Sequence, residues 1–201
     1  MPDTVVIAEI VKGAVHPTTA ELITAANALG SQPVVVVPCA DASLADGAAK
    51  FTGVAGILAA KSDVFSDYDA AGWAAALDAV TPAGIIITSA SPQSKDLAAR
   101  LAARRGISVV QDVVKIESGN LTSPIYSGKA MQTVSLSGNA VVSVRPNVFD
   151  ASGNDGSANV SVVDTSGNVA TAVQEFLARA SSRLDVAEAN IIISGGRGMG
   201  N

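Results

Sequence analysis

The stretch of this sequence best suited to ligand binding is glycine-rich, Gly195-Gly-Arg-Gly-Met-Gly200. The segment 190–194, with three isoleucines at its centre, precedes it and predicts a buried strand. A strand that runs into a glycine-rich turn is half of a phosphate-binding βα unit, and the N-terminus of a helix supplies the other half. The turn does not complete a G-x-G-x-x-G pattern, because Asn201 stands where the last glycine is needed. Its central Arg197 carries a guanidinium that can stack on a planar ring or pair with an anion.

Ser89, Ser91 and Ser94 form a second group of candidate residues. They follow the predicted strand 84–88, at the carboxyl edge where α/β sheets bind ligands. No nucleophile–base pair is visible in the sequence, and no two carboxylates show a recognisable catalytic spacing. Chemistry alone therefore does not indicate an enzyme, and a hydrolase is the least favoured class.

The remaining candidates are better explained as structural residues. His16 is expected in a loop near the start of a helix, and Trp73 lies on the apolar stripe of a predicted helix, so it is expected in the core. Arg100, Arg104 and Arg105 are expected to form a solvated helix face.

Composition excludes several functional classes. One cysteine, Cys39, and one histidine exclude a disulfide framework, a cysteine-based zinc site and a multi-histidine metal site. A net charge of −5 argues against a nucleic-acid partner. The apolar runs have strand length and residues 4–10 read as a strand, so neither membrane insertion nor a signal peptide is expected, and we expect a cytoplasmic protein.

The elements that position these residues alternate between strands and helices. With 48% hydrophobic but only 3% aromatic residues, the core is expected to be aliphatic, as in buried parallel sheets. A capping box at Thr18–Glu21 and the N-cap Ser91 predict two of the helix starts, and Gly106 predicts a helix end. The alternation predicts an α/β fold with a doubly wound, mainly parallel sheet. Predicted strands are 4–10, 33–39, 54–59 and 84–88 with a fifth from 107, and predicted helices are 18–29, 43–50, 67–80 and 91–105.

The alternation of predicted strands and helices stops after residue 112. Four short segments, 113–117, 121–126, 130–136 and 140–145, are separated by turn residues with no room for helices. They predict a small antiparallel sheet added to the parallel one. A further strand at 160–163 and a helix at 168–183 are predicted beyond it.

Several segments together resemble one known family, the α subunits of electron transfer flavoproteins, over nearly the whole chain. They include Val5-Val-Ile-Ala-Glu9, Gln111-Asp-Val113, Ser123-Pro-Ile-Tyr-Ser-Gly128 and Ile193-Ser-Gly-Gly-Arg-Gly198. No single segment is unique to this family, but the order and spacing of the segments together are specific to it. The other matching segments are residues 18–30, 94–106, 133–134 and 144–146 with Phe149.

The resemblance implies a heterodimer with an electron transfer flavoprotein β subunit. Such a pair carries one FAD and passes electrons from flavin dehydrogenases to a downstream acceptor, so this chain would be an electron carrier subunit without substrate turnover of its own. It also implies that AMP belongs to the partner subunit. Residues 1–189 would form the N-terminal domain and 190–201 the start of the FAD-binding domain. Gly196, Arg197 and Gly198 would then contact FAD, with the arginine over the flavin ring.

Two departures from the family qualify this expectation. About one domain of sequence would follow residue 201 in a complete α subunit, so we expect a truncated fragment that does not retain FAD and can self-associate without its partner. Ser123 stands where the family commonly has arginine. The alternative interpretation is a free-standing α/β nucleotide-binding regulatory module, with its site at the sheet edge near Glu9 and residues 89–94.

Overall fold

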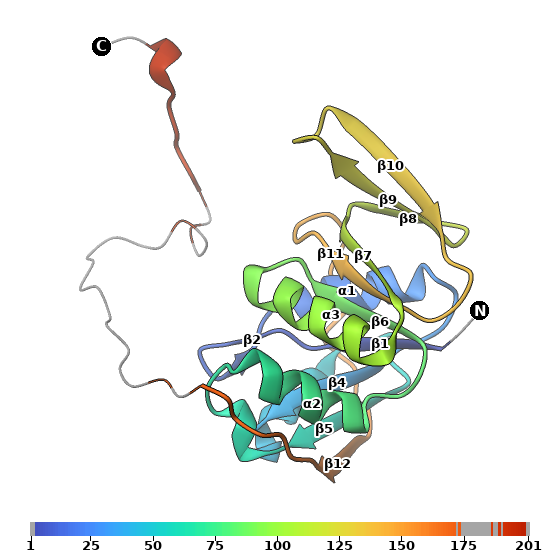
Figure 1. Cartoon of the computed structure of the whole chain (residues 1–201), viewed down its shortest axis with the longest axis vertical. Helices are drawn as coiled ribbons and strands as arrows, with labels where there is room; N and C mark the ends of the chain where they lie inside the picture. The colour runs from blue at the N-terminus through green and yellow to red at the C-terminus, as the bar shows by residue number, and fades with distance from the viewer. Residues whose placement is uncertain (1–2, 172, 174–185, 187–188, 190, 200–201) are drawn as a thin grey trace.

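A computed structural model describes residues 3–171, 173, 186, 189 and 191–199. Seven strands form a central sheet in which every neighbouring pair is parallel (Figure 1). They are β1 (Thr4–Ile7), β4 (Val34–Cys39), β5 (Gly56–Lys61), β6 (Ile85–Ser89), β7 (Ser108–Val113), β11 (Ala140–Val144) and β12 (Val160–Asp164). Their spatial order is β12-β5-β4-β1-β6-β11-β7, so the winding reverses between β1 and β6. The doubly wound parallel sheet is therefore confirmed.

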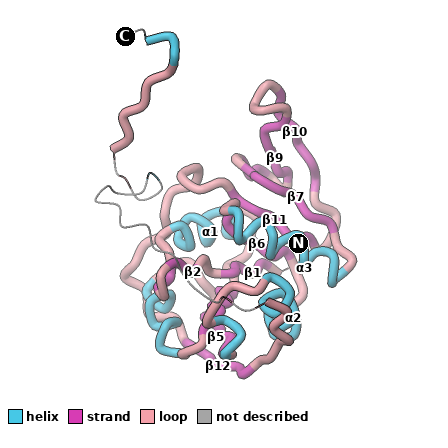
Figure 2. Tube along the Cα trace, turned by 60° about the vertical axis from the view of Figure 1, so that its left-hand side comes forward, coloured by secondary structure: helices cyan, strands magenta, loops and turns pink. Residues whose placement is uncertain are grey.

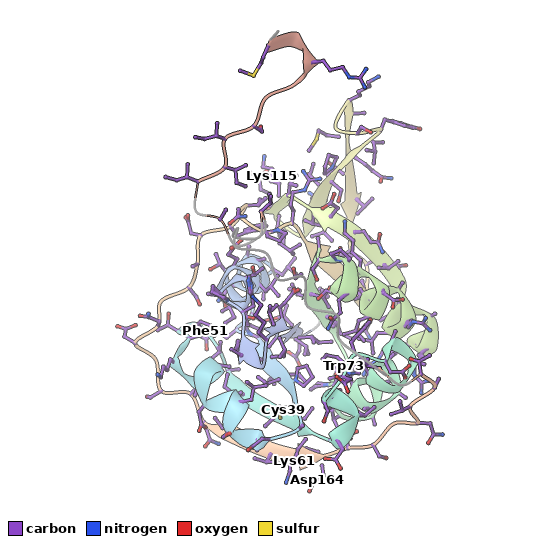
Figure 3. The ribbon with its side chains drawn as sticks, turned by 90° about the vertical axis from the view of Figure 1, so that its left-hand side faces the viewer. Cys39, Phe51, Lys61, Trp73, Lys115 and Asp164 are labelled. Atoms are coloured by element: carbon purple, nitrogen blue, oxygen red, sulfur yellow. The ribbon has the colours of Figure 1, made fainter. Side chains whose placement is uncertain are left out.

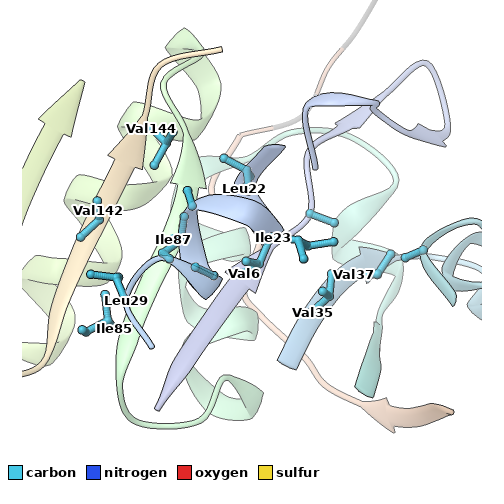
Figure 4. Packing of buried hydrophobic residues seen from close by; sticks show 14 of the residues in the cluster. Val6, Leu22, Ile23, Leu29, Val35, Val37, Ile85, Ile87, Val142 and Val144 are labelled. Atoms are coloured by element: carbon cyan, nitrogen blue, oxygen red, sulfur yellow. The ribbon is translucent and has the colours of Figure 1, made fainter. Parts of the chain in front are cut away.

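Helices cover both faces of this sheet, because its interior strands β1, β6 and β11 are buried on both sides. The helices α1 (Thr18–Asn27) and η1 (Ala42–Lys50, a 3₁₀-helix) pack on one face, and α2 (Ala70–Val80) and α3 (Pro92–Arg105) on the other. Each face carries its own cluster of buried apolar side chains, the first on the α1 side and the second on the α2 and α3 side. On β1, Val6 belongs to the first cluster and its neighbour Val5 to the second, because successive side chains of a strand point to opposite faces. Figure 4 shows the first cluster, with Leu22 and Ile23 of α1 over the sheet.

Two small antiparallel units are added to this core. One is a three-stranded sheet of β8 (Lys115–Glu117), β9 (Asn120–Ile125) and β10 (Ala130–Ser135), which projects from the body in Figures 1 and 2. Ser118 and Gly119 join the first two strands with positive φ angles of 49° and 80°, as a two-residue hairpin turn requires. The other is the hairpin of β2 (Ile10–Val11) and β3 (Ala14–Val15), of which only Ile10 was part of the predicted first strand.

The last of the four segments assigned to the antiparallel addition belongs elsewhere. β11 lies in the central sheet, parallel to both β6 and β7, so the prediction for 140–145 was wrong in orientation. Its five residues are all buried. Such a continuous apolar run is typical of an interior parallel strand and not of an alternating, half-exposed one, and that signal was present in the sequence.

The predicted caps of α3 are confirmed, whereas the capping box predicted for α1 is wrong although α1 does begin at Thr18. Ser91 Oγ accepts the Ser94 N–H at 3.2 Å, and Gly106 ends α3 with a left-handed backbone (φ 61°). The capping box at Thr18 is not formed, because the N-cap of α1 is Pro17 and Thr18 Oγ1 is hydrogen-bonded to His16 Nδ1 at 2.9 Å. Most of the predicted helix 168–183 lies outside the described residues, and residues 168–171 are not helical.

Candidate functional site

The polar residues predicted at the carboxyl edge of the sheet do lie together there. Glu9 follows β1, and Ser94 in the first turn of α3 donates its hydroxyl to Glu9 Oε2 at 3.2 Å. Ser89 Oγ accepts the backbone N–H of Ser91 at 3.3 Å, and Ser91 caps α3. These hydroxyls therefore stabilise the start of a helix, and His16 is engaged with Thr18 instead of with a serine. The arrangement contains no activated nucleophile among the residues that the structure describes.

An open cleft of about 1020 Å³ lies beside them, where β4 ends. Its wall includes residues 10 and 12–15 of the hairpin, Asp41 after β4, and an aromatic group. Two of its lining residues, Cys39 at the end of β4 and Trp73 of the aromatic group, are labelled in Figure 3. The Ser43 N–H holds the pKa of Asp41 below its usual value, so Asp41 presents a negative charge. Dinucleotide-binding folds place a glycine-rich turn between the first strand and helix. Here that connection forms the β2–β3 hairpin, so the described residues do not build the phosphate cradle that a nucleotide-binding module needs.

The aromatic group consists of Phe65, Tyr68 and Trp73 and confirms the core assignment of Trp73. The Trp73 side chain is 6% exposed and donates its Nε1–H to the Asp67 carbonyl at 2.9 Å. Phe65 and Tyr68 pack edge-on against it, with ring centroids 5.1 and 5.3 Å away. Burial, with the nearby Asp96 carboxylate, raises the pKa of Tyr68. The indole is used in packing.

Cys39 is a buried, inert thiol. It is 1% exposed, and its Sγ lies 3.4 Å from the Ala60 carbonyl oxygen. Burial raises its pKa, so the nucleophilic thiolate is disfavoured. Among the residues that the structure describes, no cluster of histidine, cysteine, aspartate and glutamate could hold a metal ion. None of the helices described has the length and apolar character needed to traverse a bilayer.

The three arginines predicted on a solvated face of α3 divide into two kinds. Arg100 pairs with Asp96 at 3.0 Å and Arg104 with Asp78 at 3.3 Å, both in exposed positions. Arg105 differs, because its side chain is only 17% exposed and its Nη2 donates to the carbonyls of Asp78 and Thr81 at 3.0 and 2.7 Å. These carbonyls lie at the end of α2, so Arg105 caps that helix. For Arg105 the prediction of a solvated charge was wrong.

Two polar centres were not identified from the sequence. Asp112, with a left-handed backbone (φ 61°), pairs with Arg145 and lies 3.7 Å from Lys95 Nζ. The second is Asp69, the N-cap of α2, which also binds Thr171. An aspartate directly before an alanine-rich helical stretch is an N-cap signal, so half of the role of Asp69 could have been found. No local pattern marks the Asp112–Arg145 pair, because 33 positions separate its members.

The glycine-rich turn places Gly196, Arg197 and Gly198 in an exposed position. Residues Arg197–Met199 form a 3₁₀ turn, and the Met199 N–H donates to the Gly196 carbonyl at 3.1 Å. The buried strand predicted at 190–194 is not formed in the described residues 191–194. There the side chains of Ile191, Ile192 and Ile193 are 82, 57 and 95% exposed. A strand needs hydrogen-bonding neighbours, and no strand of the described part of the chain pairs with this segment.

The comparisons with known proteins agree with this architecture. A family model described as "Electron transfer flavoprotein domain" matches residues 4–168. The electron transfer flavoprotein subunit alpha of Mycobacterium leprae is 32% identical over 214 residues, covering 100% of this chain and 66% of the relative. The subunit alpha of Mycobacterium tuberculosis H37Rv is 35% identical over 212 residues, with the same coverage. That of Bacillus subtilis is 30% identical over 209 residues, covering 97% of this chain and 64% of the relative.

This chain spans about two thirds of the length of the curated relatives that it matches. The match covers the central sheet from β1 to β12 together with the projecting antiparallel sheet. The chain belongs to the electron transfer flavoprotein family.

Proposed function

We propose that this chain is the scaffold part of an electron transfer flavoprotein α subunit. In this proposal residues 1–189 pack on a β subunit, and residues 190–201 begin the FAD-binding domain. The heterodimer carries electrons from flavin dehydrogenases to a downstream acceptor, and the chain turns over no substrate itself. The observation that carries the proposal is the family match over residues 4–168, joined to α-subunit relatives that cover 97–100% of the chain.

Residues Gly196, Arg197 and Gly198 are the proposed FAD contacts of this chain. FAD, when bound, supplies the reversible acceptance of electrons. The exposed guanidinium of Arg197 suits this role, because it can lie over a planar ring and offset negative charge on it. Nothing lies within 4 Å of a Cβ built at either flanking glycine, so the described chain leaves the turn open to a ring. Residues 195–199 are all exposed, so the turn does not bury a ring by itself. AMP is proposed to bind to the partner subunit.

The projecting sheet offers a surface for the β subunit. Tyr126 in the turn between β9 and β10 is 77% exposed, and Met131 near the start of β10 is 56% exposed. An exposed aromatic side chain is notable here, because only 3% of the residues are aromatic. β10 pairs with β9 along one side, and its other side pairs with no strand in the described part of the chain. Exposed aromatic and methionine side chains are enriched at protein interfaces. These features support a partner that covers this sheet.

Co-expression of this chain with its cognate β subunit, followed by size-exclusion chromatography, tests the proposal. A stable complex is expected, and the change Met131→Lys should weaken it because a charge would be buried at the interface. Val148→Lys is the matched control, since Val148 is exposed to 39% on a different loop. Absence of any complex at micromolar concentration contradicts a self-sufficient interface on this chain.

A further inference from the structure

The segment that follows β12 runs along helix α2 toward the start of that helix. Thr165 continues the ladder of β5 through its N–H to the Lys61 carbonyl at 2.9 Å. Its hydroxyl donates to the Ala76 carbonyl at 2.8 Å. Two residues later Gly167 lies against the backbone of Gly72. At the end of the segment, the Thr171 hydroxyl donates a hydrogen bond to the Asp69 carboxylate. We call residues 165–171 the strap, because its contacts on α2 progress from Ala76 to Asp69.

The middle of the strap touches the backbone of α2. A Cβ built on Gly167 would collide with the Gly72 carbonyl oxygen. A Cβ on Gly72 would lie 2.8 Å from Val64 Cγ2 and 3.2 Å from the Asn168 carbonyl oxygen. Only a pair of glycines permits this approach, so the two backbones are in direct contact.

The far end of the strap is tied to a buried carboxylate. Asp69 is 6% exposed, and its Oδ2 accepts the Gly72 N–H at 2.7 Å, which caps α2. The same oxygen accepts the Ala170 N–H at 3.3 Å, and Oδ1 accepts the Thr171 hydroxyl at 2.6 Å. The hydrogen bond from Thr171 is the largest of the effects that hold the pKa of Asp69 below its usual value. One ionised side chain thus joins the helix start to the strap.

This tie explains why residues 168–171 are not helical, although their sequence predicts a helix. The Ala170 N–H is directed to a side chain outside its own segment, and Gly167 must lie flat on α2. These tertiary contacts override the helix propensity of the segment. The start of α2 lies at the carboxyl edge of the sheet, because the helix follows β5 through the short 3₁₀-helix η2 (Asp63–Phe65).

We propose that Asp69 is a positioning residue, which latches the strap along α2 and so fixes the place at the carboxyl edge from which the remainder of the chain departs. Since that remainder is the FAD-binding part only under the function proposed above, the consequence for flavin placement rests on that function. The latch itself does not. It is a property of residues 69 and 165–171, and it can be tested on this chain with no flavin present.

Hydrogen–deuterium exchange of the 201-residue chain tests the latch with three variants. Thr171→Val removes the hydroxyl donor and keeps the shape of the side chain and the cap of α2. We expect the amides of 166–171 to exchange about tenfold faster or more, since a hydrogen bond to a charged acceptor is lost, while the α2 amides keep their rates. Asp69→Asn should free the strap with α2 still capped, whereas Asp69→Ala should also speed exchange in the first turn of α2. Thr133→Val, which removes the Thr122–Thr133 hydroxyl contact on the projecting sheet, is the control and should leave the strap unchanged.

A distance measurement reports positioning directly. Spin labels at Gln111→Cys on β7 and Val173→Cys, in a Cys39→Ala background, should give a narrow distance distribution that broadens in Thr171→Val and in Asp69→Asn. Both starting residues are exposed. Unchanged exchange in the strap and an unchanged distance distribution in both variants would overturn the latch. Failure of the heterodimer to bind flavin would contradict the proposed function and leave these two readouts as they are.

Discussion

The Arg145 guanidinium and the Asp112 carboxylate are joined by two hydrogen bonds, of which Nε to Oδ1 measures 3.1 Å. The pair lies beside a register shift between β7 and β11, where Asp112 adopts a left-handed backbone and donates its N–H to Ser143 Oγ at 3.0 Å. Asp112 thus bridges the two strands through both its backbone and its side chain, at the same sheet edge as Glu9 and Ser94.

The Asp112–Arg145 pair should contribute to stability in a pH-dependent way. The hydrogen bond from Arg145 holds the pKa of Asp112 below its ordinary 3.8, and Lys95 adds to this. The contribution is therefore complete above pH 3.8 and is lost as the pH falls through the lower folded-state pKa. Because the Arg145 side chain is 44% exposed, we expect Arg145→Met to cost below about 1 kcal/mol at pH 7.

Urea unfolding of the wild type and of Arg145→Met at pH 7 and near pH 2.5 checks this. The difference in stability between the two proteins should shrink at the lower pH. Lys129→Met, on the turn between β9 and β10, is the control for loss of a positive charge. A difference that grows on acidification would contradict the assignment.

Gly84 is expected to tolerate no side chain. Its φ is 149°, and a Cβ there would collide with the Asp3 carbonyl oxygen, which accepts the Ile85 N–H at 2.8 Å. Gly84→Ala should therefore lower the free energy of unfolding by about 2 kcal/mol or more, through backbone strain at the entrance to β6. Gly138→Ala is the matched control, because nothing lies within 4 Å of its built Cβ. Equal thermal midpoints for the two variants would refute the clash.

The neighbours Arg104 and Arg105 should respond very differently to the same change. A lysine cannot reproduce the fork of donors that Arg105 offers to the carbonyls of Asp78, Thr81 and Pro82. Arg105→Lys should cost about 1–2 kcal/mol because α2 loses its cap. Arg104→Lys keeps an exposed ion pair with Asp78, which contributes little to stability, so this change should leave the free energy of unfolding nearly unchanged. Chemical denaturation separates the two, and equal losses would mean that the cap adds nothing to stability.

The sequence predicted what depends on local pattern. Ser91 and Gly106 lie at the ends of α3 because their side-chain and backbone chemistry suits those positions without help from elsewhere. The place of β11 depends on which neighbours cover it, and these follow from the whole topology. Arg105 and Thr171 have roles that depend on residues 24 and 102 positions away, which no local spacing reveals.

The candidate site was predicted only in part. The gathering of Glu9 and Ser94 at one edge follows from parallel strands and was foreseen. That their side chains satisfy one another could not be foreseen, because it depends on how α3 sits on the sheet. The exposure of Ile191, Ile192 and Ile193 shows the limit of hydrophobic pattern, since a strand exists only where another strand pairs with it.

This chain without its β subunit is expected to bind no stoichiometric FAD. In the described part of the chain, the turn at 195–199 offers a flavin only the guanidinium of Arg197 and exposed backbone. No side chain of the central sheet covers this turn, since all five of its residues are exposed. A ring left open to water on most of its surface gains too little to offset its loss of freedom on binding. The protein should purify colourless and stay so after dialysis against FAD. A yellow protein with one FAD per chain would overturn this expectation.

Arg197 is expected to set the flavin potential of the complete heterodimer. A cation held against the ring favours the more negatively charged reduced flavin over the oxidised one, so its removal should make the reduction potential more negative. An effect of about 1.4 kcal/mol is a tenfold change in the equilibrium constant, and for one electron a tenfold change corresponds to about 59 mV. Arg197→Ala should therefore lower the potential by tens of millivolts, and Arg197→Lys, which keeps the charge without the planar fork, should lower it by less. Redox titration of the flavin absorbance in the heterodimer measures both variants against Lys50→Ala, a control at the end of η1 far along the chain from the turn. If Arg197→Ala binds flavin with its potential unchanged, the side chain has no electrostatic role at the ring, and the contact assigned to it belongs to the backbone of the turn.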